Sequence, residues 1–179
     1  MTLRVEHAPD LTPRLRDELV EVWVAATNAG GAVGLLPPTD ARAAQVLAQP
    51  LWQRLLEGRD ALTTGRVDGR LAGWFVLVSS GFVLHPHWRT LKRLQVHPDL
   101  QGRGHGSTLL AAADDAGRRL GLEALHLTVR GGTGTDGLYA RHGYREVGRL
   151  PGALRVGPGD DRDEIHMWRV LGEGDRPPA

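Results

Sequence analysis

The stretch that decides the fold is LKRLQVHPDLQGRGHGSTLL, residues 91–110. A strand ends at His97-Pro98, a short turn follows, and QGRGHG (101–106) leads directly into a helix. Glycines let a backbone approach a ligand closely, and the free N–H groups at a helix start bind phosphate oxygens. The stretch therefore predicts a phosphate-binding turn between a strand and a helix.

A glycine-rich turn alone is a weak signal, because it also serves as a tight strand-to-helix connection. The glycines fall at G-x-G-x-G, which does not match the dinucleotide fingerprint G-x-G-x-x-G, and the lysine of a nucleoside-triphosphate loop is missing. A Rossmann-type oxidoreductase is therefore the weakest alternative.

Local signals on either side predict the remaining elements. Thr12-Pro13 marks a helix start that Gly30-Gly31 ends, and Asp68-Gly69 is a two-residue hairpin turn. Asp40 opens a helical stretch that we expect Pro50 to interrupt. The expected strands cover residues 2–8, 61–67, 71–79, 88–97, 124–129, 144–150 and 164–170. Two further helices are expected at 105–120 and 138–142.

The resulting order, β-α-α-β-β-β-α-β-α-β-β, predicts an α/β fold around a mixed sheet. With 179 residues the chain fits one domain, which we place at residues 1–171, followed by a disordered tail at 172–179.

Composition excludes several function classes. The formal net charge of +1 gives no support to nucleic-acid or membrane attraction. No cysteine is present, so disulfides, thiolate metal sites and cysteine nucleophiles are ruled out, and we expect no metal site. The N-terminus lacks the apolar stretch of a signal peptide, so a cytoplasmic protein is the default.

Three motifs in order resemble those of the GNAT superfamily of N-acetyltransferases. QGRGHG matches its Q/R-x-x-G-x-G/A signature after V-H-P on a strand, Leu71-Ala72-Gly73-Trp74 looks like its third strand, and LYARHGYREVG (138–148) is similar to its closing L-Y-x-x-x-G-F/Y segment. The resemblance covers about residues 60–150 and implies the GNAT fold and an acetyl-CoA-dependent acetyltransferase. GGAVGLL (30–36) and R-L-P-G (149–152) further resemble small antibiotic-modifying acetyltransferases such as the tabtoxin-resistance branch.

The resemblance implies where acetyl-CoA binds. Backbone amides of the turn and the following helix would hold the pyrophosphate, through Gln101, Gly102, Arg103, Gly104, His105, Gly106, Ser107 and Thr108. Backbone at Leu94, Gln95 and Val96 would align the pantetheine arm, and an amide near Leu94 or Gln95 would polarise the thioester carbonyl.

Tyr139 matches the tyrosine that protonates the leaving thiolate in relatives, with a packed aromatic as the alternative. Tyr144 is expected in the core. The general base stays open: relatives often carry a carboxylate early in the fourth strand, absent here, and His85, His87, Asp136 and His166 remain. Gly132 replaces an asparagine that contacts pantetheine in relatives.

Two segments are expected near the acceptor. The loop 151–164 carries Asp160, Asp161, Asp163 and Glu164, which either form a solvated hairpin tip or an acidic rim that attracts a cationic amine. Loop 28–38 is the other expected pocket wall, with Trp23 and Trp52 nearby, more often core residues.

The acceptor is expected to be a small-molecule primary amine, attacked directly in a ternary complex, and a homodimer is open. The alternatives are a noncatalytic acyl-CoA sensor or interaction module, and an acetyltransferase acting on protein N-termini or lysines.

Overall fold

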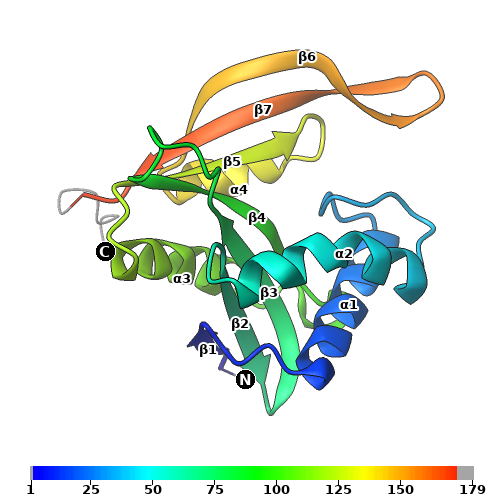
Figure 1. Ribbon diagram of the computed structural model, residues 1–179. Helices are drawn as coiled ribbons and strands as arrows, with labels where there is room; N and C mark the ends of the chain where they lie inside the picture. The colour runs from blue at the N-terminus through cyan, green and yellow to red at the C-terminus, as the bar shows by residue number, and fades with distance from the viewer. Residues whose placement is uncertain (1, 173–179) are drawn as a thin grey trace.

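The computed structural model describes residues 2–172, and seven strands form one mixed sheet in the order β1-β2-β3-β4-β5-β7-β6 (Figure 1). Only β4 and β5 run parallel; every other neighbouring pair is antiparallel. The strands are β1 (Arg4–His7), β2 (Ala61–Val67), β3 (Arg70–Val78), β4 (Trp88–Val96), β5 (Ala124–Arg130), β6 (Arg145–Gly157) and β7 (Asp160–Val170). The helices are α1 (Pro13–Asn28), α2 (Ala41–Leu56), α3 (His105–Arg119), α4 (Thr135–Arg141) and a short 3₁₀ turn η1 (Pro98–Leu100).

The predicted α/β class and element order are confirmed, and the local signals act as expected. Thr12 accepts a hydrogen bond from the Leu15 N–H at the start of α1, with Pro13 as the first helical residue. Asp68 and Gly69 both have positive φ, as a two-residue hairpin turn between β2 and β3 requires. The expected tail at 173–179 lies outside the described residues.

Helices on both faces of the sheet create two apolar cores. One core lies between the sheet and α3 and includes Phe75, Leu109 and Leu125. The second lies between the sheet and the α1–α2 pair and includes Leu19, Trp23 and Trp74. Trp23 and Trp74 meet edge to face, with ring centroids 6.2 Å apart. None of the helices formed by residues 2–172 is both long and apolar enough to cross a bilayer.

The parallel pair β4–β5 separates after three paired residues. Trp88, Arg89 and Thr90 pair with Ala124, Leu125 and His126, and no pairing continues beyond Thr90 and His126. From that point Leu91–Val96 and Leu127–Arg130 diverge, and Figure 1 shows the opening that results. Beyond this point the facing edges of β4 and β5 have N–H and C=O groups that do not pair with each other. An extended ligand could hydrogen-bond to these groups as an added strand would.

A β-bulge marks β4 at the same level. The register between β3 and β4 shifts between Trp74 and Val76, so two residues, Arg93 and Leu94, oppose Phe75 alone. Arg93 has φ +55°, an uncommon value for a non-glycine residue. The bulge turns Arg93 toward α1 and leaves Leu94 packed on the α3 side.

Three expected boundaries are wrong. Helix α2 continues through Pro50 without interruption, because Ala44, Ala48, Leu51 and Trp52 form one buried stripe that spans the proline. A proline inside a helix costs about 3 kcal/mol, and burying Leu51 and Trp52 offsets that cost.

Helix α4 starts at Thr135, three residues earlier than expected, and the residue before it, Gly134, has a left-handed conformation.

The third difference is the C-terminal hairpin. Residues 151–164 are not a loop: β6 runs to Gly157, β7 begins at Asp160, and Pro158-Gly159 forms the whole turn. Cross-strand arginine–carboxylate pairs hold this extension, including Arg155 with Asp161 at 2.7 Å. The hairpin therefore projects beyond the rest of the sheet as a long arm (Figure 1).

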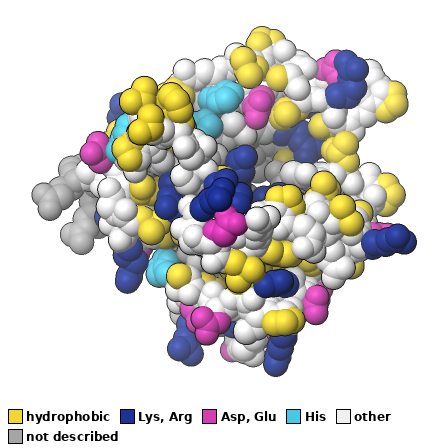
Figure 2. Space-filling model, viewed as in Figure 1, with side chains coloured by type: hydrophobic (Ala, Val, Ile, Leu, Met, Phe, Trp, Pro, Cys, Tyr) yellow, Lys and Arg dark blue, Asp and Glu magenta, His cyan; other side chains and the backbone are white. Residues whose placement is uncertain are grey.

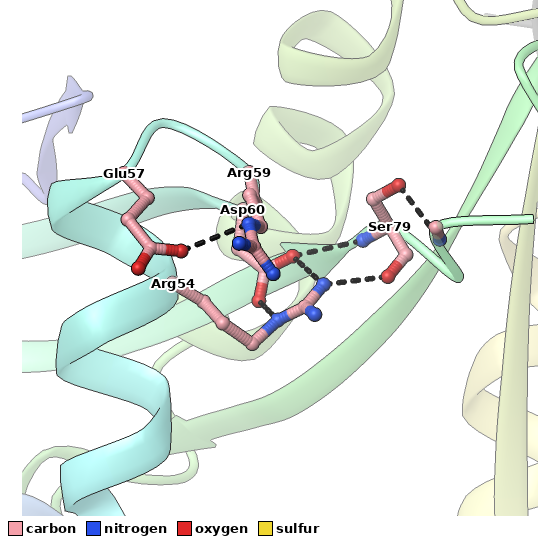
Figure 3. A network of polar contacts seen from close by, with 6 residues as sticks. Arg54, Glu57, Arg59, Asp60 and Ser79 are labelled. Atoms are coloured by element: carbon pink, nitrogen blue, oxygen red, sulfur yellow. Dashed lines mark hydrogen bonds and ion pairs between the residues drawn. The ribbon is translucent and has the colours of Figure 1, made fainter.

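An ion pair with a buried carboxylate fixes the end of α2 against the sheet. Arg54 donates from Nε and Nη2 to the two carboxylate oxygens of Asp60, both at 2.7 Å. The same guanidinium also donates to the Ser79 carbonyl, and Asp60 accepts from the Ser79 N–H (Figure 3). This network joins α2, the start of β2 and the end of β3.

Candidate active site

A cavity of about 690 Å³ lies where β4 and β5 diverge. Its walls come from loop 32–36, from Leu91, Lys92, Arg93 and Leu94 of β4, from Leu127, Thr128 and Arg130 of β5, from Tyr139, and from Ala153–Val156 and Glu164 of the hairpin arm. Figure 2 shows a hollow between the arm and the α1–α2 layer, with basic side chains inside it. Loop 28–38 thus contributes a cavity wall, as expected.

The glycine-rich turn lies at the other end of β4, at the start of α3. Gly104 is the N-cap in a left-handed conformation, and no side chain caps the helix. The first intrahelical bond runs from the Thr108 N–H to the Gly104 carbonyl, so the N–H groups of His105, Gly106 and Ser107 precede it. A Cβ built on Gly106 would meet nothing within 4 Å. An open helix start with unused donors fits a pyrophosphate well.

Side chains of the turn support its shape instead of filling it. Gln101 donates from Nε2 to the Val96 carbonyl at 2.9 Å, and Arg103 donates to the Asp99 carbonyl at 3.2 Å. Thr108 donates to the Gly104 carbonyl at 3.3 Å, and the His105 ring is buried below the helix start. The backbone of this turn is therefore the part left free for a ligand.

The three residues expected along a pantetheine arm occupy the diverging part of β4. Leu94 lines the cavity, whereas Gln95 and Val96 are buried. Gln95 pairs with Trp74 of β3, which places its side chain among the α1–α2 core residues. Only the backbone of Gln95 and Val96 is positioned to meet a ligand in the opening.

Tyr139 lines the cavity from α4 and packs against the α3 core. Its ring meets that of Tyr144 edge to face, with centroids 5.8 Å apart, and Tyr144 is in the core as expected. Burial raises the pKa of Tyr139 to about 12, so its phenol keeps its proton at neutral pH.

Gly143 ends α4 and thereby sets the position of Tyr139. It has φ +79°, and a Cβ there would lie 1.9 Å from Nη1 of Arg169. Arg169 is buried, pairs with Asp114 at 2.9 Å and donates to the His142 carbonyl. The glycine of the LYARHGY segment is thus required by both conformation and packing.

The four acid–base candidates from the sequence are dispersed. His87 and Asp136 are exposed, and His85 contacts Ser80 and the Trp88 ring. His166 differs: its Nδ1 lies 3.1 Å from Nε2 of His126, and Nδ1 of His126 lies 3.3 Å from the Thr90 hydroxyl. His126 belongs to the last paired position before β4 and β5 separate.

The charge state of His126 depends on its surroundings. Burial, followed by the charges of His166 and Lys92, lowers the pKa of His126, whereas Glu164 acts in the opposite direction. Thr128 and Glu164 line the cavity and lie beyond the histidine pair along β5 and β7, and Lys92 lines it from the neighbouring strand β4. A half-buried imidazole with a lowered pKa is neutral near pH 7 and can accept a proton.

Most of the predicted acidic rim is neutralised by arginine. Asp161 pairs with Arg155, Asp163 pairs with Arg149 at 3.1 Å, and Asp160 pairs with Arg162. Glu164 is the one member of the four that lines the cavity. The charges on this arm therefore stabilise a hairpin more than they form an anionic rim.

The family model described as the acetyltransferase (GNAT) family matches residues 16–144, which span β4, the glycine-rich turn and Tyr139. The chain belongs to this family. The expected membership of the GNAT N-acetyltransferases and the expected enzyme class are thereby confirmed. No curated protein matches the sequence.

Solved structures share the fold at low sequence identity. A candidate phosphinothricin N-acetyltransferase is 18% identical with a TM-score of 0.78, over 96% of this chain and 100% of that one. A candidate acetyltransferase of Salmonella typhimurium, yncA, solved with acetyl-CoA, is 18% identical with a TM-score of 0.75, over 100% and 99%. The ribosomal-protein-alanine N-acetyltransferase of Brucella melitensis is 19% identical with a TM-score of 0.75, over 95% and 99%.

Sequence reasoning missed Arg93, which lines the cavity, and His126, which lies at the last pairing before β4 and β5 separate. His126 stands in an alternating strand, where a half-buried histidine carries no local mark. Arg93 reaches the cavity because of a bulge that alternation does not reveal.

Proposed function

We propose that this protein transfers the acetyl group of acetyl-CoA to a primary amine of a small molecule, by direct attack of the amine in a ternary complex. The observation that carries the proposal is the opening between β4 and β5, with a free helix start at one end and a cavity lined by Tyr139 at the other. Acetyl-CoA supplies an activated thioester. The amide C–N bond forms as the C–S bond breaks, the amine loses a proton, and the coenzyme A thiolate gains one.

The proposed binding mode uses backbone more than side chains. The N–H groups at Gly104, His105, Gly106 and Ser107 bind the pyrophosphate, with Gln101, Gly102, Arg103 and Thr108 keeping the turn in shape. The backbone of Leu94, Gln95 and Val96 pairs with the pantetheine arm as an added strand would. An amide near Leu94 or Gln95 polarises the thioester carbonyl, a contribution of about 3 kcal/mol in comparable sites.

Tyr139 acts on the leaving thiolate. With the pKa of Tyr139 at about 12 and that of a thiol near 8.5, full proton transfer is uphill by about 5 kcal/mol. Donation of a hydrogen bond to the developing charge requires no such transfer. We therefore assign Tyr139 as a hydrogen-bond donor in the transition state, with the proton reaching the thiolate late.

The amine must lose a proton before it attacks. Keeping an alkyl amine neutral at pH 7 costs about 4–5 kcal/mol, so a nearby base matters. The His126–His166 pair supplies that base in our proposal, because it lies where the strands separate and the lowered pKa of His126 favours its neutral form.

The small-molecule acceptor is supported by the size of the cavity and by neighbours with names of that type. One is the spermidine/spermine N-acetyltransferase SpeG of Vibrio cholerae, 15% identical with a TM-score of 0.70. Covered by loop 32–36 and by the hairpin arm, the cavity of about 690 Å³ suits a compact molecule.

A thiol-release assay with acetyl-CoA and a panel of amines tests the proposal, with calorimetry of acetyl-CoA binding beside it. We expect micromolar binding and amine-dependent thiol release. Binding without turnover for any amine would favour a sensor, and turnover confined to peptides would favour a protein acetyltransferase. Absence of binding would remove the proposal altogether.

A further inference from the structure

The charged groups around the cavity are mostly basic. Its lining includes Lys92, Arg93, Arg130, Arg155 and one carboxylate, Glu164. Arg155 already has Asp161 as its partner at 2.7 Å. Within residues 2–172, Lys92, Arg93 and Arg130 make no ion pair, so three positive charges face a single negative one.

Arg93 is the most constrained of these cations. Its guanidinium carbon lies 4.4 Å from the centre of the Trp23 ring, and Trp23 is fully buried. Trp23 is itself held by a hydrogen bond from its indole N–H to the Val33 carbonyl at 2.9 Å, and Val33 also lines the cavity. The arginine therefore occupies a built position between α1, loop 32–36 and β4.

The position leaves the guanidinium short of partners. Nε of Arg93 is buried, and no group in the described chain accepts a hydrogen bond from it. Burial is the one cause that lowers the pKa of Arg93, which agrees with the lack of a nearby carboxylate. A buried charge without a counter-ion is costly, and the face of a tryptophan offsets only part of that cost. An anion from outside the chain would complete the site.

Acetyl-CoA does not supply that anion in the proposed binding mode. Its phosphates belong at the helix start of α3, which follows the C-terminal end of β4 by way of η1. Arg93 lies inside β4, beside the opening where the uncharged pantetheine arm would run. The anion must therefore come with the acceptor.

We infer that the acceptor carries a carboxylate as well as its primary amine, and that Arg93 binds this carboxylate. The inference rests on the proposed function and narrows its substrate class to amino-acid-like molecules. A planar guanidinium stacked on an indole is well suited to a carboxylate, because both are flat and can form paired hydrogen bonds. Lys92 and Arg130 add a favourable field, and Glu164 disfavours acceptors with a second anionic group in its direction.

The test compares matched acceptors that differ in one charge. Each L-amino acid is assayed beside its own primary amide, for wild type, Arg93→Met and Arg93→Lys. We expect wild type to favour the acids by at least about 10-fold in kcat/KM. Arg93→Met should bring the ratio to within about 2-fold, mainly through KM, and Arg93→Lys should fall between the two, since lysine keeps the charge and loses the fork.

Arg155→Met is the matched control, because Arg155 lines the same cavity and is already neutralised by Asp161. It should keep the wild-type ratio. Calorimetry of the preferred acid in the presence of coenzyme A gives a second readout, in which Arg93→Met should lose the binding heat. Wild-type kinetics that treat acids and amides alike would overturn the inference, as would an Arg93→Met that slows both equally. Absence of thiol release with every amine would instead contradict the proposed function.

Discussion

Arg54 and Asp60 form a bidentate ion pair with both contacts at 2.7 Å, and the Asp60 side chain is only 1% exposed. Because Asp60 also accepts the Ser79 N–H, three chain segments meet at one carboxylate (Figure 3). The pair holds the end of α2 against β2 and β3, and α2 in turn covers the core that contains Trp23, on which Arg93 stacks.

Removal of Asp60 should destabilise the fold strongly. In Asp60→Ala, the Ser79 N–H loses its acceptor, and the Arg54 guanidinium loses its counter-ion and keeps only the Ser79 carbonyl. We expect a loss of about 3 kcal/mol in the free energy of unfolding, measured by urea titration. Asp161→Ala is the matched control: it breaks an ion pair of the same length whose two side chains are exposed, and it should change the midpoint little. Equal losses in the two variants would refute this account.

Gly106→Ala should stabilise the protein and weaken cofactor binding. Gly106 has no positive φ and an added Cβ has open space, so alanine gains helix propensity of about 0.5–1 kcal/mol. The same methyl group would stand where the proposed pyrophosphate site lies. We expect a higher Tm of the free protein and a lower affinity for acetyl-CoA by calorimetry. Acetyl-pantetheine lacks the pyrophosphate, so wild type and Gly106→Ala should use it equally well. If Gly106→Ala is impaired with acetyl-pantetheine as strongly as with acetyl-CoA, the proposed pyrophosphate site is contradicted.

Tyr139→Phe should lower kcat by about 100-fold and leave acetyl-CoA affinity nearly unchanged, since it removes one hydrogen-bond donor from the transition state. With a folded pKa of about 12 against an ordinary 10, this phenol contributes stability below pH 10 that is lost as pH rises toward 12. The phenylalanine variant should therefore lose less stability between pH 10 and 12 than wild type. Steady-state kinetics and alkaline unfolding curves test the two parts separately, and unchanged kcat would remove Tyr139 from the mechanism.

Local signals allowed much of the fold to be predicted. Thr12-Pro13, Asp68-Gly69 and the 101–106 turn each act within a few residues, so the sequence alone contains the required information. Pro50 shows the limit of this reasoning, because its local preference against helix is outweighed by apolar burial on both sides of it. The hairpin arm shows the same limit, since its glycines and acids resemble a loop, whereas Arg149 and Arg155 pair with Asp163 and Asp161 across the two strands.

The other features near the site depend on contacts between residues far apart in the sequence and on a β-bulge, so they could not be predicted from local patterns. His126 and His166 are 40 residues apart and meet because β7 inserts between β5 and β6, an order that no pair of neighbouring segments reveals. Simple alternation would place Arg93 on the face of Leu91 and Gln95 together, whereas the bulge puts Leu91 with the α3 core and Arg93 over Trp23. A shift of one residue changes the face of a side chain, and sequence patterns do not mark where such a shift occurs.

The histidine pair should control the acidic limb of the pH–rate profile. The groups that face His126 are Thr90 and Lys92 from β4 and Glu164 and His166 from β7, and their balance with burial lowers the pKa of His126. Protonation removes the base, so kcat/KM of wild type should fall at acidic pH, with a midpoint below the ordinary histidine pKa of about 6.5. In His126→Asn this limb should disappear and the rate at pH 7 should fall by about 100-fold, the lower end of general-base effects.

The variants separate a proton-transfer role from a structural one. His166→Asn should also lower the rate, and an acceptor amine of lower pKa, already neutral at pH 7, should recover much of the loss in both variants because it needs no base. His85→Asn is the control, since His85 contacts Ser80 and Trp88 and makes no hydrogen bond to His126 or His166 among the described residues. If His126→Asn keeps the acidic limb, or if weakly basic amines recover nothing, the proton leaves the acceptor by another route and the pair only supports the junction of β4, β5 and β7.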